Sequence, residues 1–87
     1  MAKATKKQAD EIHGKFFWTL SYLNGGTSEE NARQASHCYE LLQEHAKEAA
    51  AIVANPNKRL SEDAWLMEAL SVTIPARLES FRIRYGF

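Results

Sequence analysis

The chain has 87 residues, of which 45% are hydrophobic and 25% charged, and this length and composition predict one globular domain with one modest core. Eleven lysines and arginines balance eleven aspartates and glutamates, so the formal net charge is zero and no long-range field would gather nucleic acid or an anionic membrane. The single cysteine, Cys38, excludes an internal disulfide, and the polar, basic N-terminal residues offer no apolar signal core, so we expect a cytoplasmic protein.

A first helix is predicted over residues 4–23. Its apolar residues recur at intervals of four, four and three, which places them on one helical face: Ile12, Phe16, Leu20 and Leu23. Gly25 and Gly26 follow this stripe, and glycine readily adopts the left-handed conformation that ends a helix. We therefore expect the glycine pair to join the first helix to a second one.

A second helix is predicted over residues 28–54. Thr27 and Glu30 have the spacing of a capping box, in which each side chain accepts a hydrogen bond from the other residue's backbone amide. A long stripe of mostly small residues follows: Ala35, Cys38, Leu42, Ala46 or His45, Ala49 and Val53. Pro56 disfavours helical geometry at Asn55, so the helix is expected to end there.

A third helix is predicted over residues 61–73. Ser61 and Asp63 are typical of a helix start, with Leu60 as the apolar staple residue before it. Lys58 and Arg59 are expected in the preceding turn. The apolar stripe of this helix continues beyond residue 73 and comprises Met67, Leu70, Ile74, Leu78, Phe81 and Tyr85.

Pro75 interrupts this stripe. A proline inside a helix removes one hydrogen bond and clashes with the preceding turn, at a cost of about 3 kcal/mol. We expect a kink or a break near residues 72–74, and Thr73 would cap a separate helix over residues 74–85 if the break is complete. The predicted fold is therefore an all-α antiparallel three-helix bundle whose third helix is kinked or broken near Pro75, or a bundle of four helices.

No catalytic or cofactor-binding motif stands out in the sequence. His37 and Cys38 are neighbours on one helix, so their side chains diverge and cannot act together as base and nucleophile. Candidate metal ligands on the second helix are His37, Glu40, Glu44, His45 and Glu48. Helical di-metal sites combine Glu-x-x-His pairs with glutamates of other helices, whereas here the order is reversed and the other helices offer no matching acids. We expect no catalytic, metal or cofactor site and no enzyme activity.

The last seven residues, 81–87, fit two structures. Apolar and cationic side chains alternate there, which is typical of a strand that could add to the sheet edge of a partner. Phe81 and Tyr85 also continue the helical stripe, whereas Ile83 and Phe87 fall outside it. A helix is the favoured interpretation, and it leaves open what covers Ile83 and Phe87.

Neutral charge, the lack of catalytic motifs and surplus aromatic residues lead to the functional prediction. Aromatic side chains with a polar group, at the edge of a core, are common in protein interfaces. We expect a small helical protein that binds and modulates another protein, as a monomer or a homodimer, in the manner of phage- or plasmid-encoded regulators. The predicted contact residues are Trp18, Tyr22, Trp65, Phe81, Arg82, Ile83, Arg84, Tyr85 and Phe87.

Nucleic-acid binding is the alternative. It would use basic residues near both ends of the chain: Lys3, Lys6, Lys7 and Lys15, and then Lys58, Arg59, Arg77, Arg82 and Arg84. The arginines could contact phosphate while the rings of Phe81 and Tyr85 stack on bases. Against this, the sequence has no recognition-helix or RNA-module signature, and the acidic residues of the second helix could pair with the arginines.

Overall fold

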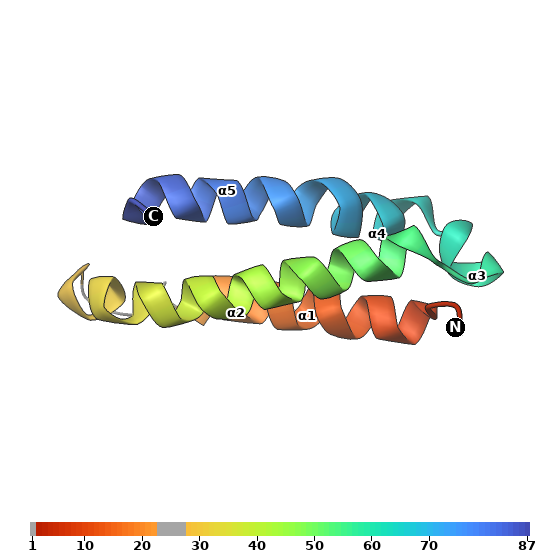
Figure 1. Ribbon diagram of the computed structural model, residues 1–87, viewed down its shortest axis with the longest axis horizontal. Coiled ribbons are helices and arrows are strands. Elements are labelled where there is room, and N and C mark those ends of the chain that lie inside the picture. Colours follow the sequence, from red (N-terminus) through yellow and green to blue (C-terminus); the bar gives the residue numbers. More distant parts are fainter. Residues whose placement is uncertain (1, 23–27) are drawn as a thin grey trace.

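The computed structural model describes residues 2–22 and 28–87, and this described part is an all-α helical bundle, as predicted (Figure 1). The molecule is a rod with principal extents of 45 × 22 × 20 Å. Two helices, α1 and α5, pack on α2 and run antiparallel to it (Figure 1). The elements are α1 (Lys6–Ser21), α2 (Ser28–Ala54), α3 (Lys58–Ser61), α4 (Ala64–Glu68), the π-helical segment η2 (Ala69–Thr73) and α5 (Ile74–Tyr85).

The predicted apolar stripes form the hydrophobic core. Its buried side chains include Ile12 and Phe16 of α1, Ala35, Cys38, Leu42 and Ala49 of α2, and Leu70, Ile74 and Phe81 of η2 and α5. The half-buried members of the stripes are Leu20, His45, Ala46, Val53, Met67, Leu78 and Tyr85. No helix in the described ranges has both the length and the apolar character that a membrane crossing requires.

Thr5 fixes the start of α1. Its side chain accepts a hydrogen bond from the Gln8 backbone N–H at 3.2 Å, and the Gln8 side chain accepts one from the Thr5 N–H at 2.9 Å. This capping box places the first helical residue two positions later than the spacing of apolar residues predicts. The predicted helix end at Leu23, the glycine pair that follows and the Thr27 cap lie outside the described residues.

The segment between α2 and α4 corrects one prediction. Lys58 and Arg59 do not lie in a turn but in the one-turn helix α3, because the Asn57 side chain accepts a hydrogen bond from the Leu60 N–H at 2.8 Å. The next helix begins after Asp63, whose carboxylate accepts from the Leu66 N–H at 3.0 Å. Two side-chain caps therefore split the predicted start of the third helix into two elements.

Pro75 does not break the helical arm that carries it. The residues before it form a π turn, in which the Ile74 N–H donates to the carbonyl of Ala69, five residues earlier. This wider turn leaves room for the proline ring, and it allows the helix to continue although Pro75 has no N–H to donate. Thr73 has helical backbone angles, φ −66° and ψ −46°, and its side chain makes no cap bond, so the prediction that it caps a separate helix is wrong.

The C-terminal residues are helical, and the strand interpretation is wrong. Helix α5 extends to Tyr85, and Gly86 then takes a left-handed φ of 75°. The Phe87 N–H donates to the Arg82 carbonyl at 2.9 Å, and the Gly86 N–H donates to the Ile83 carbonyl at 3.3 Å. These are the two hydrogen bonds of a Schellman motif, which turns Phe87 back toward the bundle.

Candidate functional site

Four aromatic residues form a cluster at the C-terminal end of the bundle. The Phe87 ring stacks on the Tyr39 ring of α2, with centroids 4.7 Å apart and planes 2° apart. Phe81 contacts Tyr85 at 4.7 Å between centroids and lies 6.4 Å from Phe87. Phe81 is 5% exposed and Phe87 is 41% exposed. The cluster therefore fixes the end of α5 against α2, and Phe87 is its outer member.

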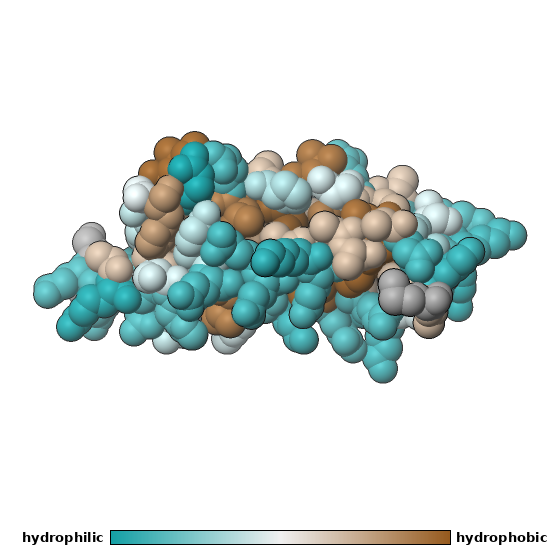
Figure 2. Space-filling model, in the orientation of Figure 1, coloured by the Kyte–Doolittle hydropathy of each residue, from teal (hydrophilic) through white to brown (hydrophobic). Residues whose placement is uncertain are grey.

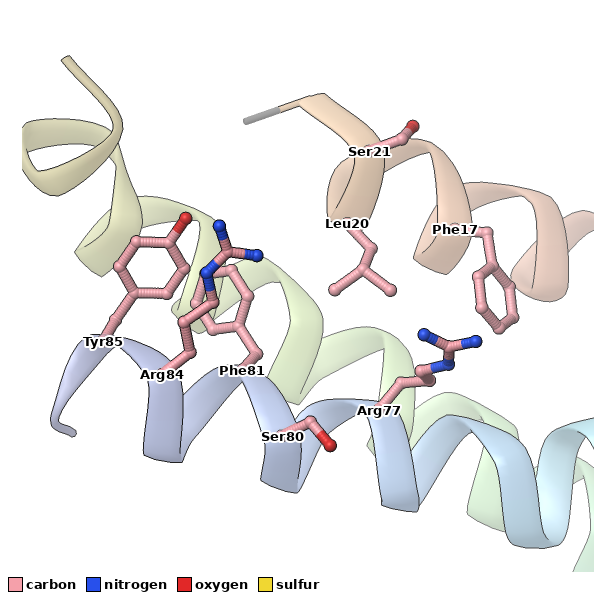
Figure 3. Close-up of a pocket in the computed structure, with 8 residues that line it drawn as sticks. All are labelled: Phe17, Leu20, Ser21, Arg77, Ser80, Phe81, Arg84 and Tyr85. Atoms are coloured by element: carbon pink, nitrogen blue, oxygen red, sulfur yellow. The ribbon is translucent and has the colours of Figure 1, made fainter. Parts of the chain in front are cut away.

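A groove of about 260 Å³ lies beside this cluster, between α1 and α5 (Figure 3). Figure 3 shows Phe17 and Leu20 extending from α1 toward α5, with the Arg77 guanidinium on the facing side. Helix α1 supplies Phe17, Leu20 and Ser21, and α5 supplies Arg77, Ser80, Phe81, Arg84 and Tyr85. The groove thus combines apolar walls with two cationic groups.

A second aromatic contact ties the α1 wall of the groove to α4. The His13 ring centroid lies 4.7 Å from that of Phe17 and 5.4 Å from that of Trp65. Trp65 is 67% exposed, so His13 covers only part of it. Because Phe17 also lines the groove, this contact holds one groove wall in a fixed position relative to α4.

The arginines of α5 have different electrostatic surroundings. Arg82 pairs with Glu79 of its own helix, with Nε donating to Oε2 at 3.0 Å, and also donates to the Phe87 carbonyl oxygen at 2.8 Å. The hydrogen bond from Arg82 holds the pKa of the Glu79 carboxyl below its ordinary value. Arg77 and Arg84 are exposed and make no ion pair within the described ranges, although the Arg84 guanidinium lies 5.5 Å from the Tyr85 ring centroid. Both of these guanidinium groups belong to the groove.

The structure brings together three of the nine predicted contact residues in the groove, namely Phe81, Arg84 and Tyr85. Four others do not line the groove and are more than 60% exposed: Trp18, Tyr22, Trp65 and Ile83. The remaining two are joined by a hydrogen bond from the Arg82 guanidinium to the Phe87 carbonyl oxygen. Four lining residues, Phe17, Leu20, Ser21 and Ser80, were not identified from the sequence as site residues, and a fifth, Arg77, was named only for the nucleic-acid alternative. Among them, Arg77 carried a signal, since it precedes Arg84 by one heptad and shares its helical face. Nothing in the sequence of α1 indicated that its wall would face α5.

Other parts of the molecule have fewer features of a binding site than the groove between α1 and α5. Cys38 is buried in the core, and burial raises the pKa of its thiol. No group of three or more histidine, cysteine, aspartate or glutamate side chains within the described ranges could hold a metal ion. A second groove, of about 420 Å³, lies between α1 and α2. Its lining combines alanines and isoleucines with Glu11, Glu48 and Lys15, so its one cation already lies among two acidic side chains.

Hydrophobic surface is unevenly distributed on the molecule. Figure 2 shows hydrophobic atoms along α5, where Ile83 is 66% exposed, and mostly hydrophilic side chains over the lower half of the view. Trp18, in the last turn of α1, and Tyr22, which directly follows the helix, are exposed and are neighbours in sequence of the groove residues Leu20 and Ser21. The exposed aromatic and aliphatic side chains of α1 and α5 therefore accompany the groove at the same end of the rod.

Comparisons of the chain with protein-family models, with curated proteins and with solved structures find no match.

Proposed function

We propose that this protein is a non-enzymatic module that binds and modulates another protein through the C-terminal end of its helical bundle. The observation that carries the proposal is the groove between α1 and α5, whose apolar walls and two exposed arginines adjoin exposed aromatic side chains. Interfaces are enriched in aromatic residues and arginine, and their strongest contacts lie in pockets shielded from water. We further propose that it acts in the cytoplasm, as a monomer or a homodimer, in the manner of phage- or plasmid-encoded regulators.

The distribution of basic residues favours a protein partner over nucleic acid. Lys3, Lys6 and Lys7 lie near α3, which carries Lys58 and Arg59, whereas Arg82 and Arg84 lie in the last turn of α5, at the opposite end of a rod 45 Å long (Figure 1). Between these ends, Lys15 lines the groove of α1 with α2, and Arg77 lines the groove of α1 with α5. Lys6 is also engaged, because its ammonium lies 3.0 Å from the Asp63 carboxylate. The two basic groups therefore do not form one continuous surface along which a phosphate backbone could run.

Affinity capture tests the proposal. The tagged full chain would be used to recover partners from its native lysate, with and without nuclease treatment. We expect a protein that co-purifies in stoichiometric amounts and survives nuclease. Recovery of nucleic acid alone, lost on nuclease treatment, would contradict the proposal and support the alternative.

A further inference from the structure

We propose that the groove between α1 and α5 binds a single amphipathic helix of the partner protein, one whose apolar face is flanked by acidic residues about seven positions apart. This inference rests on the proposed function and specifies its site and the chemistry of the partner. Helix-in-groove recognition is a common mode of protein binding, with apolar anchors spaced along one helical face.

The arrangement of the helices suits a helical occupant. Two helices, α1 and α5, pack on α2, and the groove lies between them, so a further helix there would complete a four-helix bundle. The groove volume of about 260 Å³ lies slightly below the roughly 300–1,000 Å³ typical of small-molecule pockets. Its apolar walls, Phe17 and Leu20 on one side and Phe81 and Tyr85 on the other, are the kind of surface that covers the apolar stripe of a helix.

Charge complementarity specifies the acidic flank. Arg77 and Arg84 both line the groove and are one heptad apart, which corresponds to about 10 Å along the helix axis. Among the described residues, no acidic side chain lines the groove with them. Two carboxylates seven positions apart on a bound helix could reach both guanidinium groups, each in the bidentate geometry that arginine favours. A helix with lysines at those positions would instead be repelled.

A second copy of the chain does not fit this requirement. Helix α2 carries exposed acids, Glu40, Glu44 and Glu48, but the large exposed hydrophobic side chains of the described residues all belong to other segments. Exposed Glu68 does lie beside the exposed side chains of Trp65 and Val72, but no two acidic residues of the sequence are seven positions apart, so a second copy cannot offer the required pair of carboxylates on one helix. The occupant we infer is a different protein.

Base stacking is also a poor fit to the groove. Phe81 is 5% exposed and packed against Tyr85, and Phe17 is packed against His13 and Phe16. Stacking a nucleobase requires a free ring face, which Phe81 and Phe17 do not offer, and the exposed rings of Trp18 and Tyr22 do not line the groove.

A displayed peptide library tests the inference. The probe is a phage library of 18-residue helical peptides with leucines fixed on one face and Glu, Gln or Lys allowed at the flanking positions. Selection against the full chain is expected to enrich Glu at flanking positions seven apart. Selection against the Arg77→Glu/Arg84→Glu variant should enrich Lys at the same positions. Failure to enrich any peptide, or enrichment without a charge preference, would overturn the inference.

Fluorescence polarisation of an enriched Glu peptide supplies the matched control. Arg77→Glu/Arg84→Glu is expected to weaken binding about tenfold, whereas Lys58→Glu/Arg59→Glu, the same charge change at the far end, should weaken it less than about threefold. Equal loss in both variants would contradict a local contact. Binding of a labelled single-stranded 12-mer oligonucleotide that is lost in Arg77→Glu/Arg84→Glu, with no peptide binding, would assign the groove to nucleic acid instead.

Two further measurements separate the possible failures. Circular dichroism melts establish that each variant folds, and Arg77→Gln/Arg84→Gln replaces the charge reversal if that variant does not. If Arg77→Glu/Arg84→Glu still captures the native protein partner from nuclease-treated lysate, the groove assignment fails while the binding of a protein partner stands.

Discussion

The two ends of the rod are closed by different kinds of interaction. At the end near the N-terminus, which we call the polar end, backbone hydrogen bonds join Ala4 to Asn55 at 2.8 Å and to Asn57 at 2.7 Å. Asn57 and Asp63 cap α3 and α4, and Lys6 pairs with Asp63. At the other end, which we call the aromatic end, the cluster of Tyr39, Phe81, Tyr85 and Phe87 performs the same task by ring packing.

The difference explains where the candidate site lies. Caps and backbone bridges satisfy polar groups within the chain, so they close the polar end without ring packing. The second groove beside them is lined by aliphatic side chains and two carboxylates, with no aromatic ring among its lining residues. Ring packing fixes α5 on α2 but leaves the sides of α1 and α5 partly open to solvent. The aromatic end therefore combines a rigid base with an incompletely covered apolar surface, which is what partner binding requires.

The largest expected effect concerns the aromatic end. Phe81→Ala would remove a buried ring and leave a cavity, and we expect a loss of about 3–5 kcal/mol in the free energy of unfolding, measured by urea denaturation. Ile83→Ala is the matched control, because Ile83 lies on the same helix and is 66% exposed. Its expected cost is below about 0.5 kcal/mol. Equal losses in the two variants would mean that Phe81 does not hold the bundle end together.

A smaller effect is expected at the polar end. Asn57→Ala removes the side-chain oxygen that accepts from the Leu60 N–H, and the loss of an N-cap typically costs about 1 kcal/mol. Asn57→Asp keeps such an oxygen and should restore most of the stability. The measurement is again urea denaturation at neutral pH. If Asn57→Asp is no more stable than Asn57→Ala, the cap does not stabilise α3.

The sequence was most informative where a periodic pattern decides the outcome. The stripe that includes Leu70, Ile74 and Phe81 correctly predicted one buried helical face across Pro75. The predicted cap at Thr73 failed, because a π turn can absorb a proline and no periodicity reveals such a turn in advance. The predicted turn at Lys58 and Arg59 failed for a related reason, because the side-chain caps Asn57 and Asp63 start two separate helices, α3 and α4, within a few residues of each other.

The candidate site was harder to predict because it depends on tertiary packing. Tyr85 and Arg84 were identified from their position in the aromatic tail. Phe17 and Leu20 are distant from α5 in the sequence, and they face it only because both helices pack on α2. A pattern confined to one helix shows which face is apolar, but not which other helix stands opposite its edge.

The smallest expected effect tests the ion pair at the polar end through its pH dependence. The Leu66 N–H and the Lys6 ammonium hold the pKa of the Asp63 carboxyl below its ordinary value. A carboxyl whose pKa is lower in the folded state stabilises the protein above its unfolded pKa of about 3.9, and this contribution disappears as the pH falls through the folded pKa. Asp63→Asn keeps a cap oxygen but loses the charge. Wild type should therefore melt higher than Asp63→Asn at pH 6, and the difference should narrow below about pH 4.

Lys6→Gln separates the two causes of this dependence. The hydrogen bond from the Leu66 N–H is the larger cause of the lowered pKa of Asp63. The melting temperatures of Lys6→Gln and of the double variant Lys6→Gln/Asp63→Asn should therefore still differ at pH 6, and this difference should still become smaller at low pH, nearly as much as it does with Lys6 present. The ion pair itself is partly exposed, and salt at about 1 M should reduce its share. Complete loss of the narrowing in the Lys6→Gln background would instead make the ion pair the main contact. The stability of the polar end would then depend on the Lys6–Asp63 ion pair and not on the helix cap. High salt would be expected to destabilise this end and to leave the ring packing of the aromatic end unchanged.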